Sequence, residues 1–273
     1  MSMTANESGL APAPLAAPML AIALALAASA ATAAPAQPSG GTPPSTDRLQ
    51  RLVPDLAIEE PEPTAVDGLF EVRVGGSYVY ITGDGRHAFT GDLLDLTTGR
   101  NLTEARRNGD RLSALDGFPA EALLVLPAMG EERHRIHVFT DSTCPYCQKL
   151  HEEVPALRKA GVTVAYIPFP RGGPRGPGYR ELQSVWCADD PAAAFDIAAG
   201  TDDGELVATN PDCDAARSVD AGFDLGAKLG VQGTPTIVLP SGAALPGYIE
   251  SAKLLQRLRL DDVASAPGSE ATP

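Results

Sequence analysis

The strongest constraint on the fold is a pair of cysteines three residues apart, placed where an apolar strand pattern gives way to a helical one. Residues 138–154 read VFTDSTCPYCQKLHEEV. With Cys144 as the N-cap, Pro145 takes the first helical position, where its missing N–H breaks no hydrogen bond and its fixed φ suits a helix. Cys147 then lies one turn into the helix, within reach of a disulfide to Cys144. The pattern predicts a strand, a CxxC motif and a helix, in that order.

The two cysteines of this motif have different predicted environments. On a helix, Cys147 shares one face with Leu150, Val154 and Leu157, and this face is expected to pack on a sheet. We therefore expect Cys147 to be shielded and Cys144 to lie at the exposed tip. Free backbone N–H groups and the helix dipole favour a thiolate at Cys144, which makes it the predicted nucleophile and Cys147 the resolving thiol.

The residues around the two sulfurs have lesser predicted roles. Pro145 and Tyr146, between the cysteines, are expected to tune the redox properties of the pair. His151, one turn beyond Cys147, could carry protons, but we expect a residue on the flank of the helix, because the dipole already accounts for the thiolate. Asp141 is expected to be a solvated loop residue, with an indirect role at the CxxC as the alternative.

A zinc site and an inert disulfide are the competing interpretations of the CxxC. A structural zinc site needs four ligands, and the other two cysteines, Cys187 and Cys213, form no second CxxC. We therefore predict redox chemistry with no metal and no organic cofactor, because the sulfurs themselves carry the electrons.

A second motif supports redox chemistry. In GVQGTPTIVLP, Thr234-Pro235 begins a strand, where a proline cannot serve as a central ladder residue. A cis peptide bond there would face the CxxC and leave the backbone of Thr234 free to pair with an extended substrate. Alone, such a pair of residues is usually a turn. Beside the CxxC, Thr234 and Pro235 are predicted to bind substrate.

The N-terminus predicts export. Residues 19–34, MLAIALALAASAATAA, are uncharged and end in small residues, so residues 1–34 are interpreted as a signal peptide and residues 35–44 as a Pro/Gly/Ser linker. Because residues 1–18 contain no Lys or Arg, a later start or an uncleaved anchor is the alternative. In an oxidising compartment, four cysteines are expected to form two disulfides.

The rest of the chain divides into two patterned regions. Strand alternation and glycine turns over residues 68–98 predict an antiparallel meander in an N-terminal domain, 45–101, too thin to fold alone. Residues 102–117 predict a linker helix with a bend or hinge at Gly109. Residues 118–262 follow a thioredoxin-like order, with a helical insertion at about 171–230, and residues 263–273 are expected to be a flexible tail. The fold class is thus α+β and α/β, and the net charge of -14 argues against binding of nucleic acid.

From about Gly68 to Tyr248 the chain resembles the DsbC/DsbG family of periplasmic thiol–disulfide interchange proteins. The likeness is carried by YVYITGDGRHAFTGDLLDL, VFTDSTCPYCQKLHEEV, VWCADDPAAAFD, GAKLGVQGTP and LPGY. It implies a homodimer joined through cystatin-like N-terminal domains, residues 45–101, with two thioredoxin-like domains facing a cleft. It also implies that Pro235 is the cis proline and that Cys187 and Cys213 form a structural disulfide. The alternative for that pair is two free thiols.

The resemblance departs from DsbC at one point and sets the expected function. DsbC-type isomerases usually carry Gly-Tyr between the cysteines, whereas Pro145-Tyr146 looks like DsbG. The expected function is that of a periplasmic homodimeric disulfide isomerase and reductase acting on misoxidised, partly unfolded exported proteins. The family resemblance implies a DsbD-like membrane thiol reductase as its electron donor. The alternatives are a DsbG-like reductase of sulfenylated cysteines with chaperone activity and a holdase chaperone with an incidental CxxC.

Overall fold

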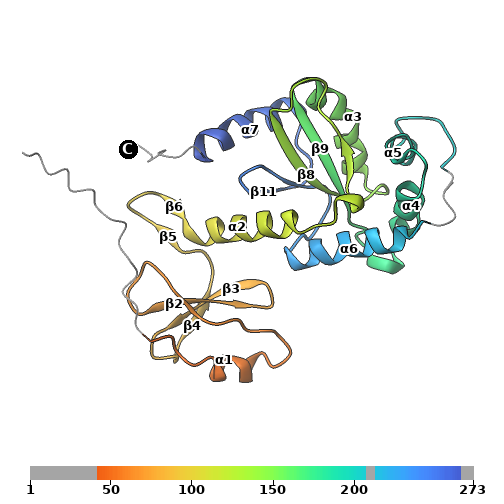
Figure 1. The fold of residues 1–273 in the computed structure, drawn as a ribbon. Coiled ribbons are helices and arrows are strands. Elements are labelled where there is room, and N and C mark those ends of the chain that lie inside the picture. The colour runs from red at the N-terminus through yellow and green to blue at the C-terminus, as the bar shows by residue number, and fades with distance from the viewer. Residues whose placement is uncertain (1–41, 207–212, 266–273) are drawn as a thin grey trace, which may run out of the picture. The chain divides into compact units, whose positions relative to one another are not determined.

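The computed structural model describes residues 42–206 and 213–265, which form an N-terminal antiparallel sheet domain and a C-terminal thioredoxin-like domain (Figure 1). The predicted signal peptide, residues 1–34, and most of the predicted linker, residues 35–44, lie outside the described residues. No helix within the two described ranges is long and apolar enough to cross a membrane. The N-terminal elements are α1 (Asp47–Leu52), β1 (Glu62–Pro63), β2 (Leu69–Val74), β3 (Ser77–Thr82), β4 (Ala88–Thr90), β5 (Leu94–Asp95) and β6 (Arg100–Asn101).

The predicted meander is a four-stranded antiparallel sheet in the order β1-β2-β3-β4. The hairpin between β2 and β3 turns at Gly75 and Gly76, whose φ values of 55° and 84° are those that such a tight turn requires and that glycine adopts without strain. Period-two alternation along β2 and β3 directs a small set of apolar side chains to one face, namely Phe70, Val72, Val74, Val79 and Ile81. This cluster is the apolar core on one face of the described N-terminal sheet, and Tyr78 and Tyr80 are buried on the other face, so the domain has a small core.

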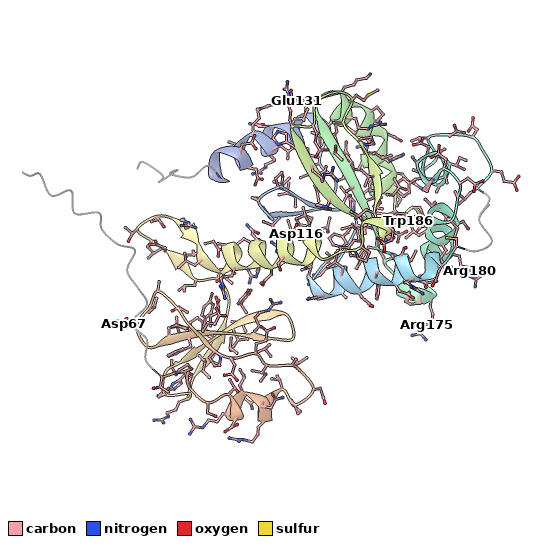
Figure 2. All side chains as sticks on the ribbon, viewed as in Figure 1. Asp67, Asp116, Glu131, Arg175, Arg180 and Trp186 are labelled. Carbon is pink, nitrogen blue, oxygen red and sulfur yellow. A yellow bond between two sulfur atoms is a disulfide. The ribbon has the colours of Figure 1, made fainter. Side chains whose placement is uncertain are left out.

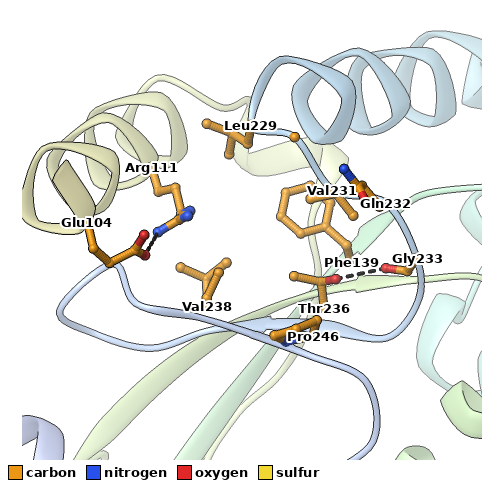
Figure 3. Close-up of a pocket in the computed structure, with 12 residues that line it drawn as sticks. Glu104, Arg111, Phe139, Leu229, Val231, Gln232, Gly233, Thr236, Val238 and Pro246 are labelled. Atoms are coloured by element: carbon orange, nitrogen blue, oxygen red, sulfur yellow. Dashed lines mark hydrogen bonds and ion pairs between the residues drawn. The ribbon is translucent and has the colours of Figure 1, made fainter. Parts of the chain in front are cut away.

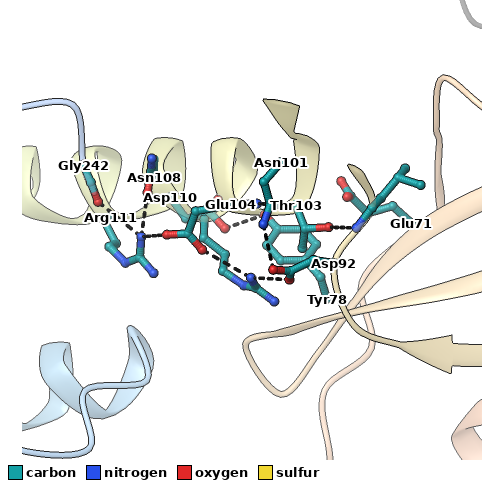
Figure 4. Close-up of polar contacts among 12 residues, drawn as sticks. Glu71, Tyr78, Asp92, Asn101, Thr103, Glu104, Asn108, Asp110, Arg111 and Gly242 are labelled. Atoms are coloured by element: carbon teal, nitrogen blue, oxygen red, sulfur yellow. Dashed lines mark hydrogen bonds and ion pairs between the residues drawn. The ribbon is translucent and has the colours of Figure 1, made fainter. Parts of the chain in front are cut away.

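Helix α2 (Leu102–Asp116) follows the sheet and is continuous through Gly109, where the sequence predicts a bend or hinge. The Asn101 side chain caps the helix by accepting a hydrogen bond of 2.8 Å from the Glu104 N–H. Polar side chains of α2 meet tyrosines of β3. Asp110 accepts from the Tyr78 hydroxyl (Figure 4). Thr103 is hydrogen-bonded to the Tyr80 hydroxyl. The capped end and these contacts hold a helix that its glycine alone would weaken.

The thioredoxin-like domain contains a five-stranded sheet in the order β11-β10-β8-β9-β7. Strands β8 (His134–Thr140) and β9 (Val162–Pro168) are parallel and joined by α3 (Pro145–Lys159), as the sequence predicts. The other pairs are antiparallel. The remaining elements are η1 (Ala120–Ala122), β7 (Leu124–Leu126), η2 (Gly173–Arg175), α4 (Pro177–Trp186), α5 (Pro191–Ala198), α6 (Ala215–Lys228), β10 (Thr236–Val238), β11 (Ala244–Pro246) and α7 (Ser251–Ser265).

Both faces of this sheet are buried, and all seven residues of β9 are buried. Alternation along β8 places Val138 in the larger cluster, with Leu157 of α3 and Leu254 of α7, and Phe139 in the smaller one, with Leu225 of α6. Helices therefore cover the sheet on both sides, which holds the C-terminal end of β8 and the start of α3 in a fixed place.

Two elements of the thioredoxin-like domain differ from the sequence prediction. The edge strand β7, which pairs with β9, was not predicted, because three residues carry too little periodicity. Helix α7 runs to Ser265, so residues 263–265, predicted as the start of a tail, are helical.

Candidate active site

The CxxC motif lies where β8 ends and α3 begins. Cys144 is the N-cap of α3, with extended backbone angles, and Pro145 is the first helical residue, as predicted. The Cys144 carbonyl accepts the first helical hydrogen bonds, from the N–H groups of Cys147 at 2.9 Å and Gln148 at 3.0 Å. Neither sulfur is part of a disulfide in this structure.

The prediction that Cys144 is exposed is wrong, because both cysteines are only 2% exposed. The loop before β10 covers Cys144: its Sγ donates a hydrogen bond of 3.3 Å to the Thr234 carbonyl. The exposed residue at the tip of the helix is Tyr146, at 63%. The spacing of the motif shows which residue starts the helix, but it cannot show that a loop 90 residues later lies against the sulfur.

The two sulfurs differ in their acid strength. Burial acts to raise the pKa of Cys144, but hydrogen bonds from the Thr234 side chain and from the N–H groups of Cys147 and Tyr146 outweigh it, so the pKa is lowered. The Thr234 carbonyl can only accept a hydrogen bond from the protonated thiol, whereas the Thr234 hydroxyl and the N–H groups stabilise the thiolate. Burial dominates at Cys147 and raises its pKa to about 11. Cys144 is therefore the stronger acid.

Three buried hydroxyls lie around the motif without a hydrogen-bond partner among the described residues, those of Thr140, Ser142 and Thr234. The Thr140 and Thr234 hydroxyls act on Cys147, where hydrogen bonding to the thiolate opposes the effect of burial. A buried hydroxyl normally has a partner. The Thr140 and Thr234 hydroxyls are therefore available to donate to a thiolate at Cys147.

Asp141 is buried, at 2% exposed, which corrects the prediction of a solvated loop residue. One carboxylate oxygen accepts from the N–H and the hydroxyl of Thr143, at 3.0 and 2.7 Å. The other accepts from the N–H and the Nε of Arg171, at 3.0 and 3.1 Å. Burial acts to raise the Asp141 pKa, but these hydrogen bonds outweigh it and lower the pKa. Asp141 thus fixes the turn before Cys144 to the start of the helical insertion.

Gly178 and the guanidinium of Arg171 also pack against this turn. A side-chain carbon at Gly178 would lie 2.3 Å from the Asp141 carboxylate, so only glycine fits there. The Arg171 guanidinium also donates to the Thr143 carbonyl at 3.3 Å. Sequence reasoning missed Arg171, because its partner lies 30 residues away in the chain.

The peptide bond between Thr234 and Pro235 is cis, as predicted. The Thr236 hydroxyl donates to the Gly233 carbonyl at 2.8 Å, which closes the turn on either side of this bond (Figure 3). The Pro235 carbonyl accepts from the Gly247 N–H at 2.8 Å. The loop is therefore held from both sides where it meets Cys144.

His151 is buried inside the domain, at 4% exposed, so the prediction of a flank residue is wrong. Its Nδ1 is 3.0 Å from the Tyr166 hydroxyl and its Nε2 is 2.7 Å from an Asp196 carboxylate oxygen. The four-residue spacing from Cys147 placed His151 on the buried face of α3 and was the signal available in the sequence.

The other two cysteines form a disulfide, Cys187–Cys213, with 5.5 Å between the Cα atoms. It joins the end of α4 to the segment before α6. Beside it, Trp186 donates its Nε1–H to the Ala122 carbonyl at 3.0 Å (Figure 2). The pairing agrees with the one that the family resemblance implied. In the described ranges no group of three or more His, Cys, Asp or Glu side chains is arranged to hold a metal.

A thioredoxin-like sheet, a CxxC at a helix N-terminus and an adjoining cis-proline loop define the class of thioredoxin-fold thiol:disulfide oxidoreductases. Residues 126–260 match the family described as "Thioredoxin-like domain", and residues 26–104 match "Disulfide bond isomerase protein N-terminal domain". Thiol:disulfide interchange protein DsbC of Dickeya dadantii is 36% identical over 212 residues, covering 77% of this chain and 83% of that protein. The Escherichia coli (strain K12) DsbC is 35% identical over 205 residues, covering 73% and 81%. The chain belongs to the DsbC family of thiol:disulfide interchange proteins.

Among solved structures, a thioredoxin-like oxidoreductase from Silicibacter pomeroyi is 21% identical with a TM-score of 0.46, covering 57% of this chain and 98% of that chain.

Proposed function

We propose that this member of the DsbC family is an exported homodimeric disulfide isomerase and reductase, in which Cys144 is the nucleophile and Cys147 the resolving thiol. The observation that carries the proposal is the pairing of a Cys144 whose pKa is lowered with a buried Cys147 whose pKa is raised to about 11. Only the thiolate attacks a disulfide, so Cys144 reacts first.

In the proposed reaction, the Cys144 thiolate attacks one sulfur of a substrate disulfide. A mixed disulfide forms, and the other substrate sulfur leaves as a thiolate. If that thiolate, or another in the substrate, attacks the mixed disulfide, the substrate is released with a new pairing and Cys144 regains its thiolate. If Cys147 attacks Cys144 instead, the substrate leaves reduced and a Cys144–Cys147 disulfide remains. A membrane thiol reductase of the DsbD type would then return the pair to its dithiol form.

The proposed dimer uses residues 45–101 of each chain, with 102–117 as the connecting helix and 118–262 as the catalytic domain. Support comes from the thin core of the sheet and from apolar side chains that the N-terminal domain leaves in solvent: Phe89 is 48% exposed, Leu94 52% and Leu96 91%. A second copy that covered these side chains would bury apolar area that the monomer leaves exposed. Two CxxC motifs in one particle would raise the effective concentration of thiols around a bound substrate.

A fragment that begins at residue 102 tests this proposal. The fragment keeps α2, whose Leu115 is buried in the smaller core cluster. We expect it to be monomeric in sedimentation, to reduce a small disulfide at about the rate of the full chain, and to lose most of its rescue of a scrambled multi-disulfide protein. If the monomeric fragment rescued that substrate as well as the full chain, a simple reductase would be the better description.

The proposed site of action is the periplasm, with residues 1–34 as the export signal. Thiol trapping of the protein taken directly from cells tests the direction of electron flow. A trapped dithiol at Cys144 and Cys147 supports an isomerase or reductase, whereas a trapped disulfide would favour an oxidase.

Reduction of sulfenylated cysteines is a second candidate, favoured by Pro145-Tyr146 between the two active-site cysteines. Reduction of a sulfenylated single-cysteine protein, measured beside rescue of a scrambled protein, separates the two. If the first reaction is fast and the second is absent, the isomerase proposal fails.

A further inference from the structure

A line of polar groups begins one helical turn beyond Cys147 and runs to the surface of the thioredoxin-like domain. Tyr166 on β9 is 1% exposed and His151 on α3 is 4% exposed. They are joined by a hydrogen bond of 3.0 Å, and a second of 2.7 Å joins His151 to Asp196 on α5. The Asp196 side chain is 51% exposed, so the line ends in water.

The direction of each hydrogen bond follows from its chemistry. The Asp196 carboxylate can only accept, so His151 Nε2 carries the proton and donates it to that carboxylate. His151 Nδ1 is then the acceptor and the Tyr166 hydroxyl the donor. Burial lowers the pKa of His151, with Asp196 opposing, so the ring is neutral at pH 7 and its Nδ1 lone pair is available.

The buried end of this line lies one helical turn from Cys147. His151 follows Cys147 by four residues on the buried face of α3, which places the two side chains one turn apart. After burial, a charge on Cys147 is the next largest cause that raises the pKa of Tyr166, followed by Asp196. Among the described residues, the titratable groups that shift the pKa of His151 or Tyr166 are therefore Cys147 on α3 and Asp196 on α5. The remaining face of the His151 ring meets Phe195, whose centroid lies 4.9 Å away.

Cys147 requires such a proton acceptor. It must lose a proton to attack Cys144, and burial, which raises its pKa to about 11, keeps the thiol protonated at pH 7. No carboxylate or imidazole is hydrogen-bonded to its sulfur in the described structure. A positioned base contributes typically about 10²- to 10⁴-fold to a step of this kind.

We propose that Tyr166, His151 and Asp196 form a proton relay for Cys147, a role that rests on the proposed function of Cys147 as the resolving thiol. As Cys147 attacks, its proton passes to the Tyr166 oxygen while the Tyr166 proton passes to His151 Nδ1. The Cys147 electron pair forms the bond to Cys144, the bond from Cys144 to the substrate sulfur breaks, and the substrate leaves as a thiolate. The imidazolium that results is paired with the Asp196 carboxylate and returns its proton to water or to the departing thiolate.

The first transfer needs the Tyr166 hydroxyl and the Cys147 sulfur to approach one another or to share a water molecule, since the two are not directly hydrogen-bonded in this structure. Tyr166 and His151 are therefore positioning residues that act through Cys147. None of the three is expected to affect the attack by Cys144.

Reaction of the full-length dithiol protein with excess 5,5′-dithiobis(2-nitrobenzoate) separates the two steps in a stopped-flow experiment. The first thionitrobenzoate is released when Cys144 attacks, and the second when Cys147 displaces it from Cys144. We expect Tyr166→Phe and His151→Gln to leave the first phase within about twofold of wild type and to slow the second at least about tenfold at pH 7. Asp196→Asn, at a half-exposed surface position, should slow the second phase by a smaller factor.

The pH profile distinguishes a relay from a structural role. In the wild-type chain the second-phase rate should change little between pH 7 and 8, because neutral His151 is the base. In Tyr166→Phe it should rise about tenfold per pH unit, as expected of unassisted ionisation. Tyr179→Phe is the matched control. Tyr179, on α4, also donates a hydrogen bond to a carboxylate, that of Asp220 on α6. This variant should behave as wild type.

Equal second-phase rates and pH slopes in wild type, Tyr166→Phe and Asp196→Asn would overturn the relay. If Tyr166→Phe does not fold, as judged by circular dichroism, Asp196→Asn and His151→Gln decide by the same measurements. Failure of the proposed function gives a different result: a wild-type chain with no second phase, or a Cys147→Ser variant that keeps it, would show that Cys147 is not the resolving thiol.

Discussion

The two cysteine pairs of this domain differ in their separation along the chain, in their surroundings and in whether they are bonded. Cys144 and Cys147 lie three residues apart at one end of a rigid helix, beside buried hydroxyls, and are not joined by a disulfide. Cys187 and Cys213 are separated by 26 residues, join two segments of an insertion, and are bonded to each other. Closing the long loop removes much of the freedom of the unfolded chain, whereas closing the short ring removes little. The comparison shows how one domain can keep one pair stable and the other reactive.

Replacing Cys144 should give the largest effect on activity. Cys144→Ser removes the more acidic thiol, so thiol–disulfide exchange should fall by about 10³-fold or more, with little change in the free energy of unfolding. The double variant Cys187→Ala/Cys213→Ala is the matched control and should react with 5,5′-dithiobis(2-nitrobenzoate) at nearly the wild-type rate. A large loss of reactivity in the double variant would show that the two pairs are not separate in function.

The same double variant should show the largest effect on stability. Loop-closure entropy for this separation gives a loss of about 3–4 kcal/mol in the free energy of unfolding. Urea denaturation of the wild type and the variant, each with Cys144 and Cys147 reduced, measures it. A loss near zero would mean that the insertion is ordered without its disulfide.

Asp141→Asn tests what holds the reactive pair in place. Asparagine keeps the shape of the side chain but weakens four hydrogen bonds. We therefore expect the free energy of unfolding to fall by about 1–3 kcal/mol. The folded-state pKa of Asp141 lies below its unfolded value, so its stabilising effect is present above the unfolded pKa of about 4 and is lost as pH falls through the folded one. The difference between wild type and variant should therefore shrink in acid. A difference that is constant from pH 7 to pH 3 would contradict this assignment.

Thr234→Val should have the smallest effect. Valine matches threonine in shape but has no hydroxyl, so the pKa of Cys144 should rise. Loss of one hydrogen bond corresponds to about a two- to tenfold lower rate of alkylation at pH 7. The rate of alkylation against pH, measured in a Cys147→Ser background, gives the pKa directly. An unchanged pKa would leave the N–H groups at the helix start as the main stabilisation.

The sequence predicted those parts of the site that depend on local spacing. The N-cap position of Cys144, the proline at the first helical position and the burial of Cys147 all follow from residues within one or two helical turns. The cis peptide before Pro235 was predicted from a proline at a strand start beside a CxxC. The parallel β8–β9 pair followed from the order of strand, helix and strand.

The parts that the sequence did not predict depend on contacts between distant segments. The burial of Cys144 requires the Thr234 carbonyl, 90 residues later. The burial of Asp141 requires Arg171, and that of His151 requires Asp196, 45 residues away. From sequence alone, a polar residue in a helix is predicted to lie on its flank, because the buried partners that would satisfy it are not known. These errors therefore concern polar groups whose partners lie in the insertion or in the loop before β10.

The segment between β9 and β10 supplies partners to both sides of the CxxC, because Arg171 binds Asp141 and Asp196 binds His151. This has a consequence for protein engineering. Consider a chimaera in which this segment is replaced by that of another thioredoxin-fold protein. The replacement would remove Arg171 and Asp196, on which the turn before Cys144 and helix α3 of this protein depend. Such a graft should keep its redox behaviour only when both residues are transplanted with it, at positions equivalent to 171 and 196.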